Sequence, residues 1–400
     1  MSGLARYSRL AALGALLMAS AASAQGANPL RIGVLSDFSG PFKDFTSRGS
    51  QIGAQMAVDE FGGKILGRPL EVVIADHQNK PDVGSAIVRR WFDTEGVEMV
   101  TDVIGSSVGL AVQSVIREKK KIAMYSGSGA VDLFGKACAP GGFVWTLNTY
   151  SLATVAGSAL MDEGADSWYL VSQDSAFGRS LENDLQKVVE SRKGKVLGIS
   201  RFPITNQDFA SQLLAAQSSK AKVIAMTAGD VPSAMKQANE FGIMAGGQKV
   251  TSLLLWVQMV KAMGLNLAKG LYLSEPFYWD LNDQTRAWSK KFFDKAGFMP
   301  SMTQAGSYSA TKHYLKAVQK AGGTDQEKVI AAMRAMPIDD ATGKGEIRPD
   351  GLVARDFYLF QVKSPAESKS DWDLYRYVRT VPAAIAAPPL AQSECPLVAK

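Results

Sequence analysis

The sequence predicts an α/β protein made of two doubly wound lobes, each a parallel sheet covered by helices. Short apolar runs alternate with amphipathic stretches along most of the chain, and this alternation occurs in two consecutive series. Strands that alternate with helices form parallel sheets of βαβ units. Removing a leader of 24 from the 400 residues leaves 376, which suits two domains of about 150 residues or more each.

The leader is the stretch "MSGLARYSRLAALGALLMASAASAQG". Arg6 and Arg9 precede a short apolar segment (10–22), and Ala22-Ser23-Ala24 is typical of a cleavage site, so residues 1–24 are predicted to be a secretory signal peptide. The alternative, a membrane anchor, needs about 20 apolar residues. We therefore expect an exported, periplasmic protein. Its formal net charge of +6 is spread along the chain, which argues against a nucleic-acid partner.

The predicted elements follow in order. The first series has strands at 31–38, 69–77, 97–105 and 121–127, with helices at 47–63, 82–96 and 106–120 between them. The second series has strands at 167–174, 195–204, 221–229 and 270–279, with helices at 178–193, 208–218 and 231–242. No third series follows. The stretch from "DFYLFQVK" (356–363) onward predicts a hairpin-like pair of strands and then a Pro-rich tail.

Three loops that follow strands of the first series are rich in Ser and Gly. They read "SDFSGPF" (36–42), "GSSVG" (105–109) and "MYSGSGAVD" (124–132). Doubly wound sheets bind ligands outside the carboxyl ends of their strands. Backbone N–H groups, hydroxyls and helix N-termini gathered there suit a carboxylate or another small anion. Helix capping explains any one such loop by itself, but three neighbouring loops predict a polar floor for a ligand.

Other chemistry is disfavoured by what the sequence lacks. His77 and His313 lie on different predicted elements, no Gly-x-Ser-x-Gly elbow occurs, and no metal-ligand spacing is present, so we expect no enzyme, metal or cofactor. Cys138 and Cys395 predict a disulfide in an exported protein, and two separate buried thiols are the alternative. The loop closed by this bridge would stabilise the protein by roughly 4–5 kcal/mol.

Several stretches in this order resemble the branched-chain amino-acid-binding (Leu/Ile/Val-type) family of ABC-transporter periplasmic substrate-binding proteins. They are "IGVLSDFSGPF", "GSQIGAQMAVDEFGG", "DHQNKPDVGSAIVRRWFDTEGVEMVTDVIGSSVGLAV", "SQDSAFGRSLENDLQKVV", "FPITNQDFASQLLAAQSSKAKVIAMTAGDVPSAMKQANEFGI" and "AGSYSATKHYLKAVQKAG". The resemblance implies the type I periplasmic binding fold, with two lobes joined by a hinge. The N-terminal lobe is expected at 28–147 plus 281–355, the C-terminal lobe at 148–280 plus 356–380, and a disulfide-tied tail at 381–400.

The family also implies a monomer that holds a small molecule between its lobes and delivers it to an ABC permease. The ligand-binding residues expected from the matching loops and from nearby aromatic positions are Phe45, Ser106, Ser107, Ser126, Gly127, Ser128, Thr149, Tyr150, Phe177, Asp230, Trp256 and Phe277. For Phe277 the alternative is an ordinary core position.

This chain departs from the family where amino-acid binders place acids. The stretches "WTLNTYSLAT" (145–154) and "VTSLLLWVQMV" (250–260) contain none, so a buried ligand ammonium would lack its usual counter-charge. We therefore expect an aromatic carboxylate. Two alternatives stay open: an amino acid whose amine reaches Asp230 or Glu275, and a receptor that signals to a membrane kinase.

Overall fold

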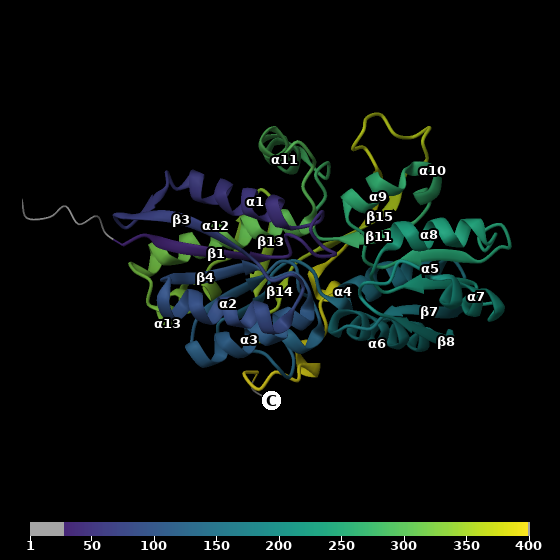
Figure 1. The fold of residues 1–400 in the computed structure, drawn as a ribbon, viewed down its shortest axis with the longest axis horizontal. Helices are drawn as coiled ribbons and strands as arrows, with labels where there is room; N and C mark the ends of the chain where they lie inside the picture. Colours follow the sequence, from purple (N-terminus) through teal and green to yellow (C-terminus); the bar gives the residue numbers. More distant parts are fainter. Residues whose placement is uncertain (1–27, 399–400) are drawn as a thin grey trace, which may run out of the picture.

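Two lobes lie side by side in the computed structural model, which describes residues 28–398 (Figure 1). The predicted signal peptide lies outside the described residues. Purple, blue and green segments build one lobe, and teal segments build the other together with two late yellow strands. Among the described residues, no helix is both long enough and apolar enough to cross a membrane.

The N-terminal lobe is a six-stranded sheet in the order β2-β3-β1-β4-β5-β6. Its strands are β1 (Leu30–Ser36), β2 (Lys64–Ile65), β3 (Arg68–Asp76), β4 (Val97–Asp102), β5 (Ile122–Tyr125) and β6 (Gly142–Val144). Every pair is parallel except the short β2–β3 hairpin, which confirms the parallel first series. The three Ser/Gly-rich loops therefore follow the neighbouring strands β1, β4 and β5.

Helices cover both faces of this sheet. Buried side chains of α2 (Pro81–Thr94) and α3 (Ser106–Lys119) share one apolar cluster with the sheet, and those of α12 (Met302–Ala321) and α13 (Gln326–Arg334) share another. The helix α1 (Ser47–Glu60) packs along α12. Both helix layers are apparent in Figure 1.

The C-terminal lobe contains two sheets. The parallel one has the order β10-β9-β7-β8, and the antiparallel one the order β11-β15-β16. Its strands are β7 (Ser167–Gln173), β8 (Lys195–Phe202), β9 (Val223–Met226), β10 (Lys249–Ser252), β11 (Tyr272–Glu275), β15 (Phe357–Val362) and β16 (Tyr375–Val381). The hairpin-like pair is confirmed as β15 and β16. The placement of strand 270–279 in the parallel series was wrong, because β11 pairs antiparallel with β15.

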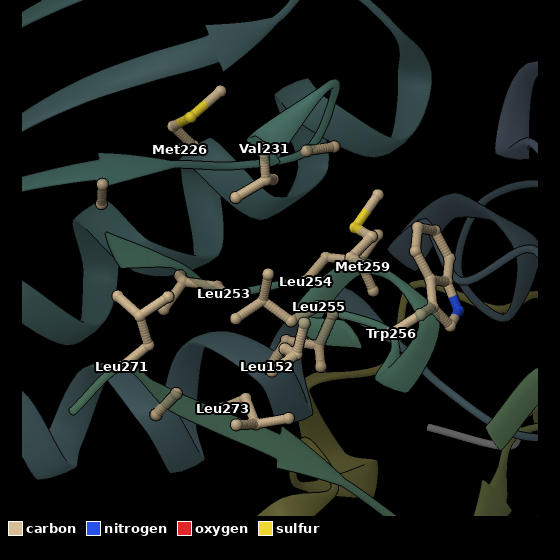
Figure 2. Close-up of a cluster of buried hydrophobic side chains, with 14 of the residues drawn as sticks. Leu152, Met226, Val231, Leu253, Leu254, Leu255, Trp256, Met259, Leu271 and Leu273 are labelled. Atoms are coloured by element: carbon tan, nitrogen blue, oxygen red, sulfur yellow. The ribbon is translucent and has the colours of Figure 1, made fainter. Parts of the chain in front are cut away.

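Helices of this lobe occur where the second series predicts them, and several short ones were not expected. The helical segments are α4 (Thr149–Leu152), the π-helical turn η2 (Ala153–Gly157), α5 (Ser158–Asp162), α6 (Ala176–Ser191), α7 (Ala210–Ser218), α8 (Val231–Glu240), α9 (Val257–Met263) and α10 (Leu265–Ala268). Figure 2 shows why the stretch around α9 lacks acids: Leu253, Leu254 and Leu255 pack into the apolar core of the lobe, and Trp256 lies at its margin.

The chain passes between the lobes at four places, after β6, after β11, after β14 and, at the start of the C-terminal tail, after β16. The segment following β11 returns to the N-terminal lobe and builds further elements of that lobe. These are α11 (Asp283–Ala296), α12, α13, β12 (Ile338–Asp340), β13 (Gly343–Ile347) and β14 (Val353–Ala354). Two lobes joined by crossing segments are the architecture of a type I periplasmic binding protein. The exact lobe boundaries stay predictions.

A disulfide joins Cys138 and Cys395, whose Cα atoms lie 5.6 Å apart, so the predicted bridge is confirmed. After β16 the tail runs through α14 (Ala383–Ala386) to the N-terminal lobe. Ser151 in the first crossing donates its hydroxyl to the carbonyl oxygen of Ala386 at 2.7 Å. The tail is therefore held both by the covalent bridge and by a hydrogen bond beside the crossing segments.

Candidate ligand-binding site

A cavity of about 430 Å³, counted with the part that opens to solvent, lies between the lobes. Its walls come from both lobes and from the first crossing segment. The lining residues are Phe42, Asn79, Ile104, Gly105, Ser106, Ser107, Gly127, Leu147, Gln173, Ser175, Phe177, Ile204, Ala228, Leu254 and Trp256.

The loop after β1 brings Phe42 into the cavity wall. Asp37 shapes this loop, because its two carboxylate oxygens accept hydrogen bonds from the backbone N–H groups of Gly40 (2.7 Å) and Phe42 (2.9 Å). Burial of the Asp37 carboxyl raises its pKa, and these hydrogen bonds partly offset that rise. A short polar loop thereby fixes an aromatic ring at the cleft.

The loop after β4 delivers the first turn of α3 to the cavity. Gly105 precedes this helix with a φ of 88°, and a side chain there would place a Cβ only 2.6 Å from Oδ1 of Asn79. The hydroxyl of Ser106 accepts hydrogen bonds from the backbone N–H groups of Gly129 and Ala130, both at 3.1 Å. Ser106 therefore ties the loop after β4 to the loop after β5.

Two helix N-termini meet at the cavity. Ser107, in the first turn of α3, accepts a hydrogen bond at its hydroxyl from the backbone N–H of Ala176, the first residue of α6, at 3.4 Å. Ser175 caps α6 by accepting from the N–H of Gly178. The first N–H groups of a helix have no partner within the helix, and they carry partial positive charge. Such groups favour an anion.

Aromatic rings close the other side of the cavity. Phe177 lies in the first turn of α6 and is 8% exposed, and Trp256 precedes α9 and is 2% exposed. The ring of Phe45 stacks on Trp256 across the cleft, with centroids 5.0 Å apart and planes 3° from parallel. The indole Nε1 of Trp256 is buried without a hydrogen-bond partner. This donor is available to an acceptor that reaches it.

None of the residues that line the cavity is Asp, Glu, Lys, Arg or His. Two acids, Asp44 and Asp230, line an adjoining hollow, which shares Phe42, Gln173 and Ile204 with the cavity. Asp230 caps α8 and accepts hydrogen bonds from the N–H and hydroxyl of Ser233. No group of three or more His, Cys, Asp or Glu that could hold a metal ion occurs within residues 28–398.

The structure brings together five of the expected ligand-binding residues. Ser106, Ser107, Gly127, Phe177 and Trp256 all line the cavity. The other ten lining residues were not among those expected, and they are Phe42, Asn79, Ile104, Gly105, Leu147, Gln173, Ser175, Ile204, Ala228 and Leu254. Phe42 lies in the stretch "SDFSGPF" and Ser175 in the stretch "SQDSAFG". Both stretches follow predicted strands, and this position at a strand end could have identified the two residues.

Other expected residues support the site from behind. Ser126 bonds through its hydroxyl to Ser307 at 2.9 Å, and the hydroxyl of Ser128 donates to the carbonyl oxygen of Val103. The hydroxyl of Thr149 bonds to that of Ser180 at 2.8 Å. These hydroxyls are engaged within the protein, so their direct contact with a ligand stays a prediction.

The last four, Phe45, Tyr150, Asp230 and Phe277, lie outside the cavity lining, and Phe45 lines the adjoining hollow. Tyr150 lines a separate hollow beneath the tail, and Asp230 lines the adjoining hollow described above. Phe277 is 1% exposed and packs edge-on against Trp288, with ring centroids 5.8 Å apart. Phe277 is therefore a core residue, which was the alternative to a ligand-binding role.

Known proteins match this chain over most of its length. The family model described as "Periplasmic binding protein" matches residues 29–369. A periplasmic binding protein from Burkholderia mallei is 41% identical in sequence, covers 93% of this chain and all of its own, and superposes with a TM-score of 0.91. The chain therefore belongs to the periplasmic binding protein family.

Two further solved structures are similar to this chain. A branched chain amino acid ABC transporter periplasmic ligand-binding protein from Burkholderia xenovorans LB400 is 37% identical, covers 92% of this chain and 99% of its own, and has a TM-score of 0.83. A solute binding protein of an ABC transporter from R. palustris, in complex with benzoate, is 20% identical, covers 90% of this chain and 97% of its own, and has a TM-score of 0.79. The latter likeness shows the fold alone. The family consists of solute-binding proteins rather than enzymes.

Proposed function

We propose that this protein is the periplasmic solute-binding component of an ABC importer and that it binds a small aromatic carboxylate between its lobes. A monomer closes over the acid and presents both lobes to a membrane permease. Closure follows ligand binding because the closed form makes contacts with the ligand that the open form lacks.

The observation that carries this proposal is a cavity without charged side chains beside two helix N-termini. A carboxylate accepts hydrogen bonds from the backbone N–H groups in the first turns of α3 and α6, such as those of Ser107 and Phe177. Charge-assisted hydrogen bonds of this kind are the stronger ones. An ammonium group in the same place would find no carboxylate, and burying an unpaired charge is costly.

The apolar walls favour a flat ring. Phe42, Phe177 and Trp256 line the cavity together with Ile104 and Ile204. Aromatic contacts of this kind add about 0.5–1.5 kcal/mol beyond the burial of apolar surface. The R. palustris protein solved in complex with benzoate shares this fold.

A branched-chain amino acid is the second candidate. The adjoining hollow contains Asp230, and a ligand that extends past Phe42 and Gln173 brings an amine toward it. The 37% identical Burkholderia xenovorans protein, described as a branched chain amino acid binder, favours this reading. Asp230→Asn distinguishes the candidates: it weakens leucine binding strongly if the amine rests there, and it leaves benzoate binding unchanged.

A thermal-shift screen with benzoate, benzamide and leucine tests the ligand class. A ligand at about 100 times its Kd adds roughly 2.7 kcal/mol to stability. We expect benzoate to raise the Tm most and benzamide, which has the same ring without the charge, to raise it less. A shift with leucine and none with benzoate overturns the aromatic assignment. Co-purification with a permease supports transport, whereas capture of a histidine kinase supports the sensor alternative.

A further inference from the structure

Most non-glycine residues with a positive φ in the N-terminal lobe lie on the cleft side of its sheet, and the exceptions are Leu66 and Lys120. Among the described residues, nine that are not glycine have a positive φ. Five of these lie at or after the carboxyl ends of the neighbouring strands β1, β3 and β4, on the cleft side. They are Ser47 (44°), Gln78 (53°), Asn79 (54°), Asp102 (71°) and Val103 (50°). Strained backbone tends to cluster at functional sites.

Val103 is the most unfavourable of these five. A β-branched residue with positive φ is a genuine outlier, because its side chain crowds the backbone in that conformation. Asp102 directly before it is also left-handed, and both residues are fully buried. The pair turns the chain from the end of β4 into the Ile104–Ser107 segment, which lines the cavity.

Three hydrogen bonds from neighbouring segments hold this turn. The N–H of Val103 donates to the carbonyl oxygen of Leu35 at 2.8 Å, and the N–H of Gly127 donates to the carbonyl oxygen of Asp102 at 2.9 Å. The hydroxyl of Ser128 donates to the carbonyl oxygen of Val103. The ends of β1 and β5 thereby force a conformation that the two residues would not adopt alone.

We propose that Asp102 and Val103 are positioning residues, whose left-handed turn aims the first turn of α3 into the cavity before ligand arrives. The proposal rests on the proposed function only in that a ligand carboxylate is anchored at Gly105–Ser107. Ser128 accordingly acts through the turn rather than on the ligand. A site that is ordered in advance avoids the entropy cost of ordering it on binding.

Two variants of one position separate this role from simple packing. Val103→Ala and Val103→Gly both remove the buried side chain, and only glycine relieves the left-handed strain. We expect Val103→Gly to have the higher Tm of the two, the reverse of the usual order. We also expect it to bind about two- to fivefold more weakly than Val103→Ala, from the extra freedom of one glycine.

Lys193 offers a matched control. It is exposed, has a φ of 64° and lies after the C-terminal end of α6, away from the cavity lining. Lys193→Gly should likewise be more stable than Lys193→Ala, with no difference in affinity. A lower Tm for Val103→Gly than for Val103→Ala overturns the proposal, as does equal affinity of those two variants.

Titration calorimetry with benzoate and, in parallel, with leucine keeps the two proposals apart. Binding of leucine alone defeats the aromatic assignment, and the Val103 variants are then compared with leucine. If neither probe binds, hydrogen exchange of the ligand-free protein decides. The N–H groups of residues 105–108 should exchange faster in Val103→Gly than in Val103→Ala, and equal protection overturns the positioning role.

Discussion

Replacing Asp102 by Asn should change how the stability of the protein depends on pH. Asp102 is fully buried at the end of β4, and this burial raises the pKa of its carboxyl from 3.8 to about 7. Hydrogen bonds from nearby serine hydroxyls, such as that of Ser126 at 3.4 Å, offset only part of this rise. The folded protein therefore keeps a proton that the unfolded chain has lost between about pH 4 and pH 7.

This difference in pKa determines whether Asp102 stabilises the protein more at low or at high pH. The favourable contribution of Asp102 is fully present below pH 3.8, and it is lost as the pH rises through 7. A difference of about three pKa units, at 1.36 kcal/mol per unit, corresponds to about 4 kcal/mol. About 2.5 kcal/mol of this loss falls between pH 5 and pH 8. Asparagine has nearly the same shape and does not titrate. The Asp102→Asn variant therefore does not lose this stability as the pH rises.

Urea denaturation of the wild type and the variant at pH 5, 6, 7 and 8 measures the effect. The free energy of unfolding of Asp102→Asn, relative to the wild type, should become more favourable by about 2.5 kcal/mol across this range. Asp184→Asn is the control: burial raises the pKa of Asp184 to about 6, so its gain should be smaller, about 1.4 kcal/mol. A difference between wild type and Asp102→Asn that stays constant with pH would refute the reasoning.

Three other predictions concern the bridge, the aromatic wall and the hinge. Cys395→Ser should lower the Tm, because the bridge spans 257 residues and lowers the conformational entropy of the unfolded chain. This effect stabilises the folded protein by at most about 5.5 kcal/mol, and an unchanged Tm contradicts the prediction. Phe177→Ala should weaken benzoate and benzamide alike in calorimetry, by about 0.5–1.5 kcal/mol each, and loss of benzoate binding alone argues against ring contact. Small-angle scattering should give a smaller radius of gyration with saturating benzoate than without ligand, and equal radii speak against hinge closure.

The order of strands and helices could be predicted from the sequence because it depends on local periodicity. Buried parallel strands such as "IAMY" need continuous apolar runs, and the helices between them need one apolar stripe. The Ser/Gly-rich strand ends could be predicted for the same reason. Parallel strands expose their carboxyl ends at one edge, so loops far apart in sequence, such as those at Ser106 and Gly127, meet there.

Which side chains face the ligand cavity was decided only by the tertiary structure. Phe42 and Phe45 lie three residues apart in one loop, yet the hydrogen bonds of Asp37 place Phe42 in the cavity wall and leave Phe45 stacked on Trp256 of the other lobe. The role of Ser128 likewise depends on the left-handed backbone of Val103. Periodicity reports the average burial of a segment, whereas these contacts arise between segments that approach each other only after both lobes have folded.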